Sequence, residues 1–528
     1  MGKRRGRLKL KEHGTIVKTC RSCLRVALLY PSVYAAAVAS LAYQNMYYML
    51  NSMENVVAER FIATNTTGEE PPPRSLETLT PLHKFDVIIA PVSYELDLVT
   101  LARMLIAAGI QPLREPRKTS SPMLVLGGPV ASVNPLVALG FADLILIGEL
   151  EPLLPRLVEE LASSGPQALE TLACRPGFLA SNCSRVARVW ARDLDRAYHT
   201  TLQFRIPGSG EPWGEAYMVE VSRGCPYMCR FCMESHFLLP LRHRSASRVK
   251  ELVERGVEVN QVSKVAFYAL SFFDHPAADE LLEYVRSEGL EASIGSLRGD
   301  QLSEDRIELI ALLGQKHVSI APETFSRRLC LGIGKCIGYE KVYEVAVAAW
   351  RRGMRVKLYL MLGLPGERDS DIEEYGRALY RLAKAAPPLK AALRVSINPL
   401  VPKPFTPLQY IPFIRRSDYE RRVRILKRFA SRVLEVDHLS YRYAYAQAVI
   451  ARGDEKIARL IVAWAMRGGR LGHFYRAAAS IGINLDNYTR GLEGQPAWHR
   501  YVDMNFPEKS LKLSYHESMR RLSASTRF

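Results

Sequence analysis

Three cysteines lie close together near the middle of the chain. Cys225, Cys229 and Cys232 stand in the sequence Glu-Val-Ser-Arg-Gly-Cys-Pro-Tyr-Met-Cys-Arg-Phe-Cys, with the spacing C-x3-C-x2-C. Three thiolates can hold three irons of a four-iron cluster and leave the fourth iron open for another ligand. Because the next cysteine is the distant Cys330, the spacing predicts a 4Fe-4S cluster with one open iron.

The same residues allow two alternatives to a cluster. A zinc ion accepts mixed cysteine and histidine ligands, so His236 or His243 could complete a short zinc knuckle. The three thiols could also be unrelated core residues. An apolar, strand-like run at 217–221 precedes the motif, which places the thiols just after the end of a strand.

The chain after the motif alternates between buried strand patterns and amphipathic stretches. Further strands are predicted at 262–269, 290–297, 317–323, 356–362 and 393–399. With the run at 217–221 they predict a parallel sheet with crossover helices that curls into a partial (β/α)6 barrel. Chemistry in such barrels sits at the carboxyl ends of the strands, where the cysteine motif falls.

With Phe231 before its last cysteine, the motif resembles that of the radical S-adenosylmethionine (SAM) superfamily. The resemblance implies that the open iron chelates the amino and carboxylate groups of SAM. One electron from a reductant such as ferredoxin or flavodoxin would then cleave SAM to methionine and a 5′-deoxyadenosyl radical, which abstracts hydrogen from a substrate. No Ser/His/Asp or paired-carboxylate arrangement in the sequence indicates hydrolysis instead.

The end of the fifth predicted strand reads Lys357-Leu-Tyr-Leu-Met-Leu-Gly363-Leu-Pro-Gly366-Glu367. Its glycines let the backbone approach a ligand closely, and the apolar residues before them offer a dry wall for a flat ring. The segment resembles the G-x-I-x-G-x-x-E element that packs against the adenine of SAM in the superfamily. Without the cysteine motif, Gly-Leu-Pro-Gly would be typical of an ordinary turn.

Two further positions at strand ends are candidates for SAM contacts. Glu323 resembles the position that contacts the ribose or methionine part of SAM, although an acid at a helix N-terminus would explain it equally. The Gly-Gly-Glu sequence that binds the methionine amino group in many members is absent after the second strand. Ser271 and Asp274 stand in its place, and Asp274 could supply the negative charge.

A second α/β unit precedes the barrel. Strands are predicted at 26–30, 85–91, 123–126 and 144–147, with helices at 33–51, 96–108 and 153–161. This order predicts a doubly wound, Rossmann-like sheet whose ligand edge lies at the carboxyl ends of its strands. Gly127-Gly128-Pro129 and Gly148-Glu149 fall at two of those ends.

Residues 24–165 resemble the cobalamin (B12)-binding domain of an uncharacterised B12-type radical SAM family. The matching pieces are Tyr-Pro-Ser-Val-Tyr, Gly-Gly-Pro and Asn134-Pro135. The Asp-x-His-x-x-Gly sequence that supplies a histidine to cobalt is absent, and Ser32, Val33 and Tyr34 occupy its loop. Two alternatives are therefore open. The domain could bind cobalamin without a protein histidine, or it could have kept only the fold. Either way, no histidine ligand is expected.

Length and composition predict about three domains in 528 residues that are 48% hydrophobic. We expect a basic leader (1–23), the Rossmann-like domain (24–165), a connector (166–210), the barrel (211–412) and a basic, mainly α-helical region (413–528).

An oxygen-sensitive cluster implies that the protein works in the reducing cytoplasm. The uncharged run at 26–50 is interrupted by Pro31 and several polar residues, so we expect no membrane anchor.

The net charge of +18 favours binding to a polyanion such as RNA. It could instead serve only to keep the protein soluble. The Arg-rich helix predicted at 417–434 is either a solvated amphipathic helix or a nucleic-acid surface.

Four more thiols lie in two pairs, Cys20 with Cys23 and Cys174 with Cys183. They could form a second cluster, a zinc site, a redox pair or structural thiols.

The predicted function is a radical SAM enzyme with an unknown substrate. Within this class, methyl or methylthio transfer to RNA or protein and ring-forming or rearranging chemistry are all open. A non-enzymatic, basic RNA-binding Fe–S protein is the alternative from another class.

Overall fold

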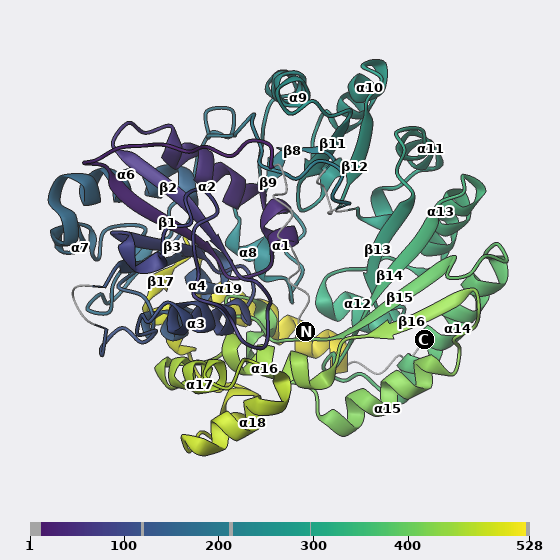
Figure 1. Ribbon diagram of the computed structural model, residues 1–528. Helices are drawn as coiled ribbons and strands as arrows, with labels where there is room; N and C mark the ends of the chain where they lie inside the picture. The colour runs from purple at the N-terminus through teal and green to yellow at the C-terminus, as the bar shows by residue number, and fades with distance from the viewer. Residues whose placement is uncertain (1–11, 118–120, 211–214, 296, 524–528) are drawn as a thin grey trace, which may run out of the picture.

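The computed structural model describes residues 12–117, 121–210, 215–295 and 297–523 (Figure 1). Residues 1–11 of the predicted basic leader therefore lie outside the described residues. Two α/β halves lie side by side, and the helices of the C-terminal region pack below them in this view. None of the described helices has the length and apolar character needed to cross a membrane.

The N-terminal half is a six-stranded sheet with the order β2-β1-β3-β4-β5-β6, parallel except for the edge strand β6. Its strands are β1 (Leu24–Tyr30), β2 (Val56–Ile62), β3 (Val87–Pro91), β4 (Met123–Gly127), β5 (Leu144–Leu146) and β6 (Phe178–Leu179). The doubly wound prediction is confirmed. The first five strands have the flavodoxin-like order, with the switch point between β1 and β3.

Helices cover both faces of this sheet (Figure 1). They are α1 (Tyr34–Val38), α2 (Leu41–Asn51), α3 (Asp97–Ala107), α4 (Pro129–Val133), α5 (Pro135–Leu139), α6 (Leu150–Ser164) and α7 (Ala168–Leu172). The helix predicted at 33–51 is broken at Ser40, whose hydroxyl accepts a hydrogen bond from the Tyr43 N–H and so caps α2.

Strand β2 was not predicted, because charged residues interrupt its apolar pattern. Arg60 is fully buried there, and its guanidinium bonds to Glu77 and Glu12, each at 2.6 Å. Its planar group also lies 4.1 Å from the ring centroid of Phe204. A buried arginine is tolerated only with such partners, and the sequence does not reveal them.

The second half contains seven parallel strands in two sheets, arranged as an open arc (Figure 1). The sheets are β8 (Tyr217–Glu220), β11 (Lys264–Tyr268) and β12 (Glu291–Ile294), then β13 (His317–Glu323), β14 (Arg355–Leu362), β15 (Leu393–Pro399) and β16 (Leu434–His438). The covering helices are α9 (Ala246–Asn260), α10 (Ala278–Ser287), α11 (Glu304–Leu312), α13 (Tyr339–Arg351), α14 (Asp369–Ala385) and α15 (Arg416–Lys427). The partial barrel is confirmed, with one strand more than predicted.

Burial alternates along β14 and identifies its two faces. Val356, Leu358, Leu360 and Leu362 are buried, whereas the residues between them are only half-buried. Alternate residues of a strand point to opposite faces, so the buried set packs under the covering helices. Lys357, Tyr359 and Met361 therefore face the inside of the arc.

The predicted helix at 417–434 is wrong in its second half. α15 ends at Lys427, and residues 434–438 form β16, which pairs in parallel with β15. Leu434 is fully buried opposite Leu393, so tertiary packing overrides the helical spacing of the arginines.

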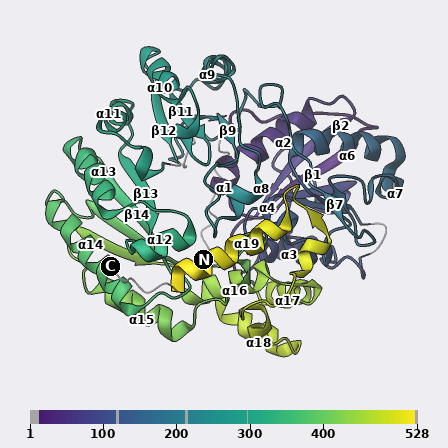
Figure 2. The same cartoon turned by 180° about the vertical axis from the view of Figure 1, so that it is seen from behind.

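The C-terminal region joins the two halves. It contains α16 (Tyr441–Ala451), α17 (Glu455–Ala465), α18 (Leu471–Ser480) and α19 (Glu508–Ser523). α17 packs on α3 of the first half, and α19 packs on α12 (Arg327–Ile333) of the second (Figure 2). The predicted connector 166–210 supplies β6 and also β7 (Val186–Ala187), which pairs with β17 (Val502–Asp503).

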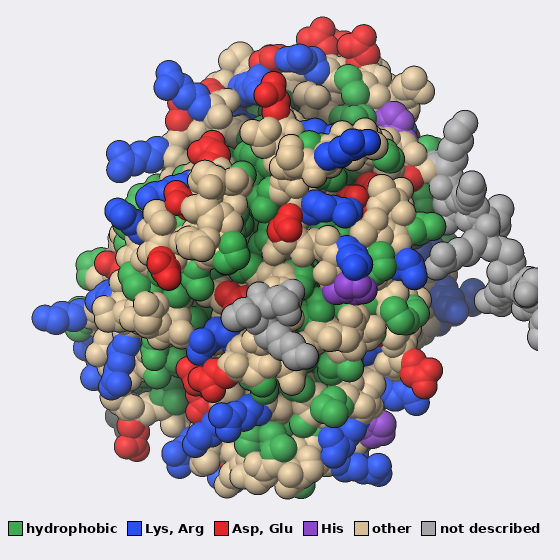
Figure 3. Space-filling view, turned by 60° about the vertical axis from the view of Figure 1, so that its left-hand side comes forward, with side chains coloured by type: hydrophobic (Ala, Val, Ile, Leu, Met, Phe, Trp, Pro, Cys, Tyr) green, Lys and Arg blue, Asp and Glu red, His purple; other side chains and the backbone are tan. Residues whose placement is uncertain are grey.

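Lysine and arginine side chains are spread over the face in Figure 3, interspersed with aspartate and glutamate.

Candidate functional site

The cysteine loop connects β9 (Ser222–Arg223) to α8 (Met233–Phe237). Gly224 has a φ of +98°, and a Cβ there would lie 2.9 Å from the backbone of the loop at 238–241. Met228 also has a positive φ, of 47°. The Cys232 N–H donates to the Cys229 oxygen over 2.9 Å. These features tightly fold the loop that carries the three thiols.

All nine cysteines are described, and only the three in this loop are free. The others form the disulfides Cys20–Cys23, Cys174–Cys183 and Cys330–Cys336. Each disulfide joins cysteines that are near in sequence. The four thiols considered for a second metal site are therefore two separate disulfides, which are structural or redox pairs.

The three free thiols lie in a partly desolvated place. Burial raises the pKa of Cys225 and Cys232, and it raises that of Cys229 to about 11. The other two thiols of the loop raise the Cys229 pKa further, whereas Lys335 and Arg298 lower it. The thiols thus lie close to one another and face two cations, which would stabilise a group of negative thiolates.

The zinc alternatives do not match this geometry. No three Cys, His, Asp or Glu side chains among the described residues surround a point where one ion could sit. His236 Nδ1 instead lies 2.8 Å from the Cys232 oxygen, and His243 Nδ1 lies 2.8 Å from Ser222 Oγ. A single zinc ion needs all its ligands at about 2.0–2.3 Å, whereas the thiolates of a four-iron cluster bind separate irons. Three free thiolates are the ligand type that a four-iron cluster takes, and Cys225, Cys229 and Cys232 are the residues that would hold it.

Arg230 ties this loop to two helices. Its Nη1 donates to the oxygens of Leu331 and Gly332, and its Nη2 lies 2.9 Å from Glu517 Oε2 in α19. The neighbouring Phe231 is half-buried and packs against the main core. Loop 224–232 is thus held against α12 and α19.

A polar network lies between the cysteine loop and the end of β11. Tyr227 of the loop donates to Asp274 Oδ1 over 3.0 Å, and Gln301 Nε2 donates to the same oxygen over 2.6 Å. Ser271 is buried and donates to Gln301 Oε1. Asp274 Oδ2 is buried and has no partner among the described residues. One carboxylate oxygen is therefore oriented by the network, and the other can accept from a ligand.

Glu323 ends β13 in a strained conformation. Its φ is +66°, beside a break in the β13–β14 register. Burial raises the pKa of its carboxyl group, and the ammonium of Lys335, 2.9 Å away, lowers it. A non-glycine residue in this region costs about 1–3 kcal/mol and is typical of functional sites.

The loop after β14 is a tight turn at Gly363. Gly363 has a φ of +91°, and its N–H donates to Glu367 Oε2 over 2.8 Å. Arg422 of α15 lies 2.6 Å from the same oxygen. Burial raises the pKa of Glu367 to about 8, although Arg422 lowers it. Glu367 thus stabilises the turn by accepting a hydrogen bond from the Gly363 N–H, while the backbone of Gly363 lies at the sheet edge.

Lys357 lies apart from these residues. It pairs in register with Ser319 and Arg394 in mid-sheet, and its ammonium is 4.6 Å from the ring centroid of Tyr359. Five residues of strand separate it from the end of β14, a distance of about 16 Å. The structure therefore does not bring Lys357 to the edge that holds the other candidates.

Sequence reasoning missed four residues of the site. Tyr227, Gln301, Arg298 and Lys335 all contact or face predicted residues, and the Arg298 guanidinium lies 3.4 Å from the Tyr227 ring centroid. Only Tyr227 had a local signal, because it lies inside the cysteine spacing. Arg298 and Gln301 lie in the connection between β12 and α11, and Lys335 follows α12, so only the fold brings them to the cysteine loop.

A cleft of about 510 Å³ separates the two α/β halves. One wall is the ligand edge of the N-terminal sheet, with Pro91, Gly128 and Glu149. The other wall includes Phe237 and Tyr268 from the barrel half. No histidine is among the described residues that line it.

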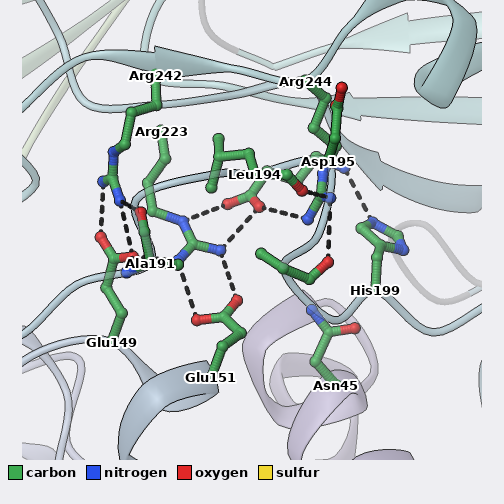
Figure 4. A network of polar contacts seen from close by, with 12 residues as sticks. Asn45, Glu149, Glu151, Ala191, Leu194, Asp195, His199, Arg223, Arg242 and Arg244 are labelled. Carbon is green, nitrogen blue, oxygen red and sulfur yellow. Dashed lines mark hydrogen bonds and ion pairs between the residues drawn. The ribbon is translucent and has the colours of Figure 1, made fainter.

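A network of buried ion pairs crosses beside this cleft (Figure 4). Arg223, just before the cysteine loop, pairs with Glu149 at 2.6 Å and Glu151 at 2.9 Å, both from the N-terminal half. Arg242 also pairs with Glu149, at 2.7 Å. Arg223 pairs within its own half with Glu220 at 2.8 Å. Removing one partner of such a buried set typically costs about 3–5 kcal/mol, so the network fixes the cysteine loop relative to the N-terminal sheet.

The network also sets the charge of its buried members. Burial raises the pKa of Glu220, but Arg223 and Arg244 outweigh this effect and hold it at about 2. Burial lowers the pKa of His199 to about 3. His199 is therefore neutral, and its Nε2 accepts a hydrogen bond from the Glu220 N–H.

Comparisons with known proteins match both halves of the chain. The family model "Radical SAM proteins, N-terminal" matches residues 42–176, and "Radical SAM superfamily" matches residues 219–379. An uncharacterised protein of Methanocaldococcus jannaschii is 28% identical over 83% of this chain and 90% of its own length. One from Methanopyrus kandleri is 24% identical over 65% of this chain and 73% of its own length.

A solved structure shares the overall fold. It is the radical S-adenosylmethionine methyltransferase TsrM from Kitasatospora setae, with cobalamin and a 4Fe-4S cluster bound. The match has a TM-score of 0.54 at 12% identity and covers 87% of this chain and 99% of TsrM. At this identity the likeness concerns the arrangement of the domains.

Proposed function

We propose that this chain, an enzyme of the radical SAM superfamily, holds a 4Fe-4S cluster on Cys225, Cys229 and Cys232 and cleaves SAM reductively to modify a substrate. The observation that carries the proposal is the set of three free thiols in one tight loop, with the other six cysteines paired. When bound, the reduced cluster would supply the electron that splits SAM into methionine and a 5′-deoxyadenosyl radical.

The chain's own residues would bind and orient SAM. Asp274 contacts Tyr227 of the cysteine loop through Oδ1, which leaves its Oδ2 free to accept a hydrogen bond. Oδ2 therefore suits the ammonium group of SAM. The backbone at Gly363 suits the adenine, and Glu323 suits the ribose or methionine part. Lys335 and Arg298 would compensate the negative charge of the cluster thiolates.

Replacing Asp274 with Asn should weaken SAM binding about 10-fold, because a hydrogen bond to a charged group contributes about 1.5–3 kcal/mol. The change keeps the side-chain size, so the cluster and the fold should be retained. SAM affinity can be measured anaerobically by equilibrium dialysis, with iron content determined on the same sample.

Asp279→Asn is the matched control, because Asp279 is exposed and pairs with Arg306 on the surface. It should bind SAM as the unchanged protein does. Equal affinities for Asp274→Asn and Asp279→Asn would remove the role assigned to Asp274.

Two alternative roles are proposed for the N-terminal half. The cleft at its ligand edge would hold a corrinoid without a histidine, or the domain serves only to complete the fold. The loop after β1 offers Ser32 and Tyr34, which are weaker cobalt ligands than imidazole.

Anaerobic incubation with hydroxocobalamin, followed by one-electron reduction to the Co(II) form, should therefore give either no bound corrinoid or one whose paramagnetic resonance spectrum lacks a protein nitrogen on cobalt. Stoichiometric cobalamin with such a nitrogen would contradict this expectation. It would also favour methyl transfer as the reaction.

The reaction and substrate are proposed only by class. The chain requires an external electron donor, for which ferredoxin or flavodoxin is suitable. Methyl or methylthio transfer to RNA or protein is the main alternative to a hydrogen-abstraction reaction without group transfer. Untargeted mass spectrometry of RNA and metabolites from cells with and without the gene would separate these outcomes. Since the chain is a radical SAM enzyme, the non-enzymatic alternative is set aside.

A further inference from the structure

We propose that a basic, tyrosine-lined hollow in the C-terminal region binds single-stranded polynucleotide. The hollow has a volume of about 510 Å³ and lies between α15, the end of β16 and the start of α16. It is separate from the cluster site and the interdomain cleft, and nothing in the proposed SAM chemistry uses it. We call it the α15–α16 hollow, and its main lining residues are Arg416, Arg424, Lys427, His438, Tyr441 and Arg442.

The positive charge of the α15–α16 hollow is largely uncompensated. Arg416, Arg424 and Lys427 lie on one face of α15, because they are eight and then three residues apart. Arg416 pairs with Glu420 at 2.7 Å. Arg424, Lys427 and Arg442 are exposed and have no ion-pair partner among the described residues. Three free cations are thus directed to solvent around one depression.

Their spacing suits a polymer better than a single anion. From Arg416 to Lys427 the helix advances by about 16 Å, which is longer than one phosphate group. Arg442 adds a cation from a different helix on the other side of the hollow. A chain of phosphates could contact all of them, whereas a small anion could contact only one or two.

Aromatic rings extend from the hollow to the surface of α18. Tyr441 stacks on Tyr445 with ring centroids 5.8 Å apart, and Tyr445 stacks on Tyr475 at 6.0 Å. The side chain of Tyr475 is 42% exposed and ends the row. Burial raises the pKa of Tyr475, whereas Arg442 and Arg416 lower it, which agrees with cations and rings that share one surface.

Cations beside a tyrosine row that ends at the exposed ring of Tyr475 favour nucleic acid over other polyanions. Base stacking on aromatic side chains is tolerant of sequence, and basic side chains follow the phosphates. A solvated amphipathic helix would explain the arginines of α15 but not the tyrosine row beside them. His438 ends β16 at the same edge of the sheet as Glu323 and Gly363, so a bound strand would lie beside the carboxyl ends of the barrel strands.

The test is binding of fluorescently labelled single-stranded RNA and DNA of one sequence to the full chain, measured by anisotropy at several salt concentrations. The triple variant Arg424→Gln, Lys427→Gln, Arg442→Gln should lose about 30-fold in affinity, and the slope of log affinity against log salt should fall by about 2. The control triple variant Arg255→Gln, Arg286→Gln, Arg351→Gln removes the same charge from exposed positions on α9, α10 and α13. It should change affinity less than about 2-fold.

Stacking is tested without changing charge. Tyr475→Ser should weaken binding about 10-fold, whereas Tyr380→Ser, at a residue that is 50% exposed on α14, should not. Binding of either RNA or DNA with this pattern supports the proposal, and a preference between them identifies the source of the polynucleotide. The proposal is overturned if neither binds, if both triple variants behave alike, or if Tyr475→Ser has no effect and inorganic polyphosphate competes as well as the polynucleotide.

Discussion

Replacing Cys229 with Ala should abolish both the iron-dependent absorbance of the anaerobically reconstituted protein and its formation of 5′-deoxyadenosine from SAM. Cys229 is the most deeply buried of the three free thiols and lies between the other two in the loop. Two thiolates cannot fix a four-iron cluster with one open iron. No other thiol can replace the lost ligand, because the remaining six cysteines are paired.

The control is the double variant Cys174→Ser, Cys183→Ser, which removes two thiols at a disulfide in the N-terminal half. It should keep its iron and its activity after reconstitution. Iron and sulfide determination, together with chromatography of the nucleoside product, gives both readouts on one sample. A Cys229→Ala protein with full iron that still cleaves SAM would show that the cluster is held elsewhere.

Gly363→Ala should raise the SAM dissociation constant by about 10-fold or more and leave the iron content unchanged. The φ of Gly363 is +91°, and a Cβ there would lie 2.9 Å from the Ile414 side chain. The methyl group therefore displaces either Ile414 or the backbone that is proposed to lie against the adenine. The cluster loop belongs to different strands, so its thiols should be unaffected.

Gly353→Ala separates the backbone strain from the effect on the site. Gly353 also has a positive φ, of +71°, but a Cβ there would meet nothing within 4 Å. It lies between α13 and β14, before the strand rather than at its ligand end. Both variants should lose stability in thermal unfolding, Gly363→Ala more because of its contact with Ile414, whereas only Gly363→Ala should lose SAM affinity. Equal SAM affinities would exclude Gly363 from the SAM site.

Local sequence patterns predicted the parts of the fold that depend on neighbours in the chain. The cysteine spacing, the turn at Gly363 and the barrel strands are all encoded within short segments, and the structure has each of them. β2 and β16 were missed because their burial depends on distant partners. Arg60 needs Glu12 and Glu77, and Leu434 needs Leu393.

The candidate site shows the same division. Asp274 was placed correctly at a strand end, but its contact with Tyr227 and Gln301 joins three separate loops. The positive φ of Glu323 has no sequence signal, because glutamate rarely adopts it. Lys357 was grouped with Gly363 because they share a motif, yet an extended strand carries it about 20 Å away.

The central claim is that this chain holds a four-iron cluster that cleaves SAM. The most direct measurement is anaerobic reconstitution with iron and sulfide, reduction with dithionite and addition of SAM, followed by quantification of bound iron, 5′-deoxyadenosine and methionine. The account predicts about four irons per chain and equal amounts of the two products. An iron-loaded chain that produces no 5′-deoxyadenosine, or a chain that retains one zinc ion instead of the cluster, would contradict it.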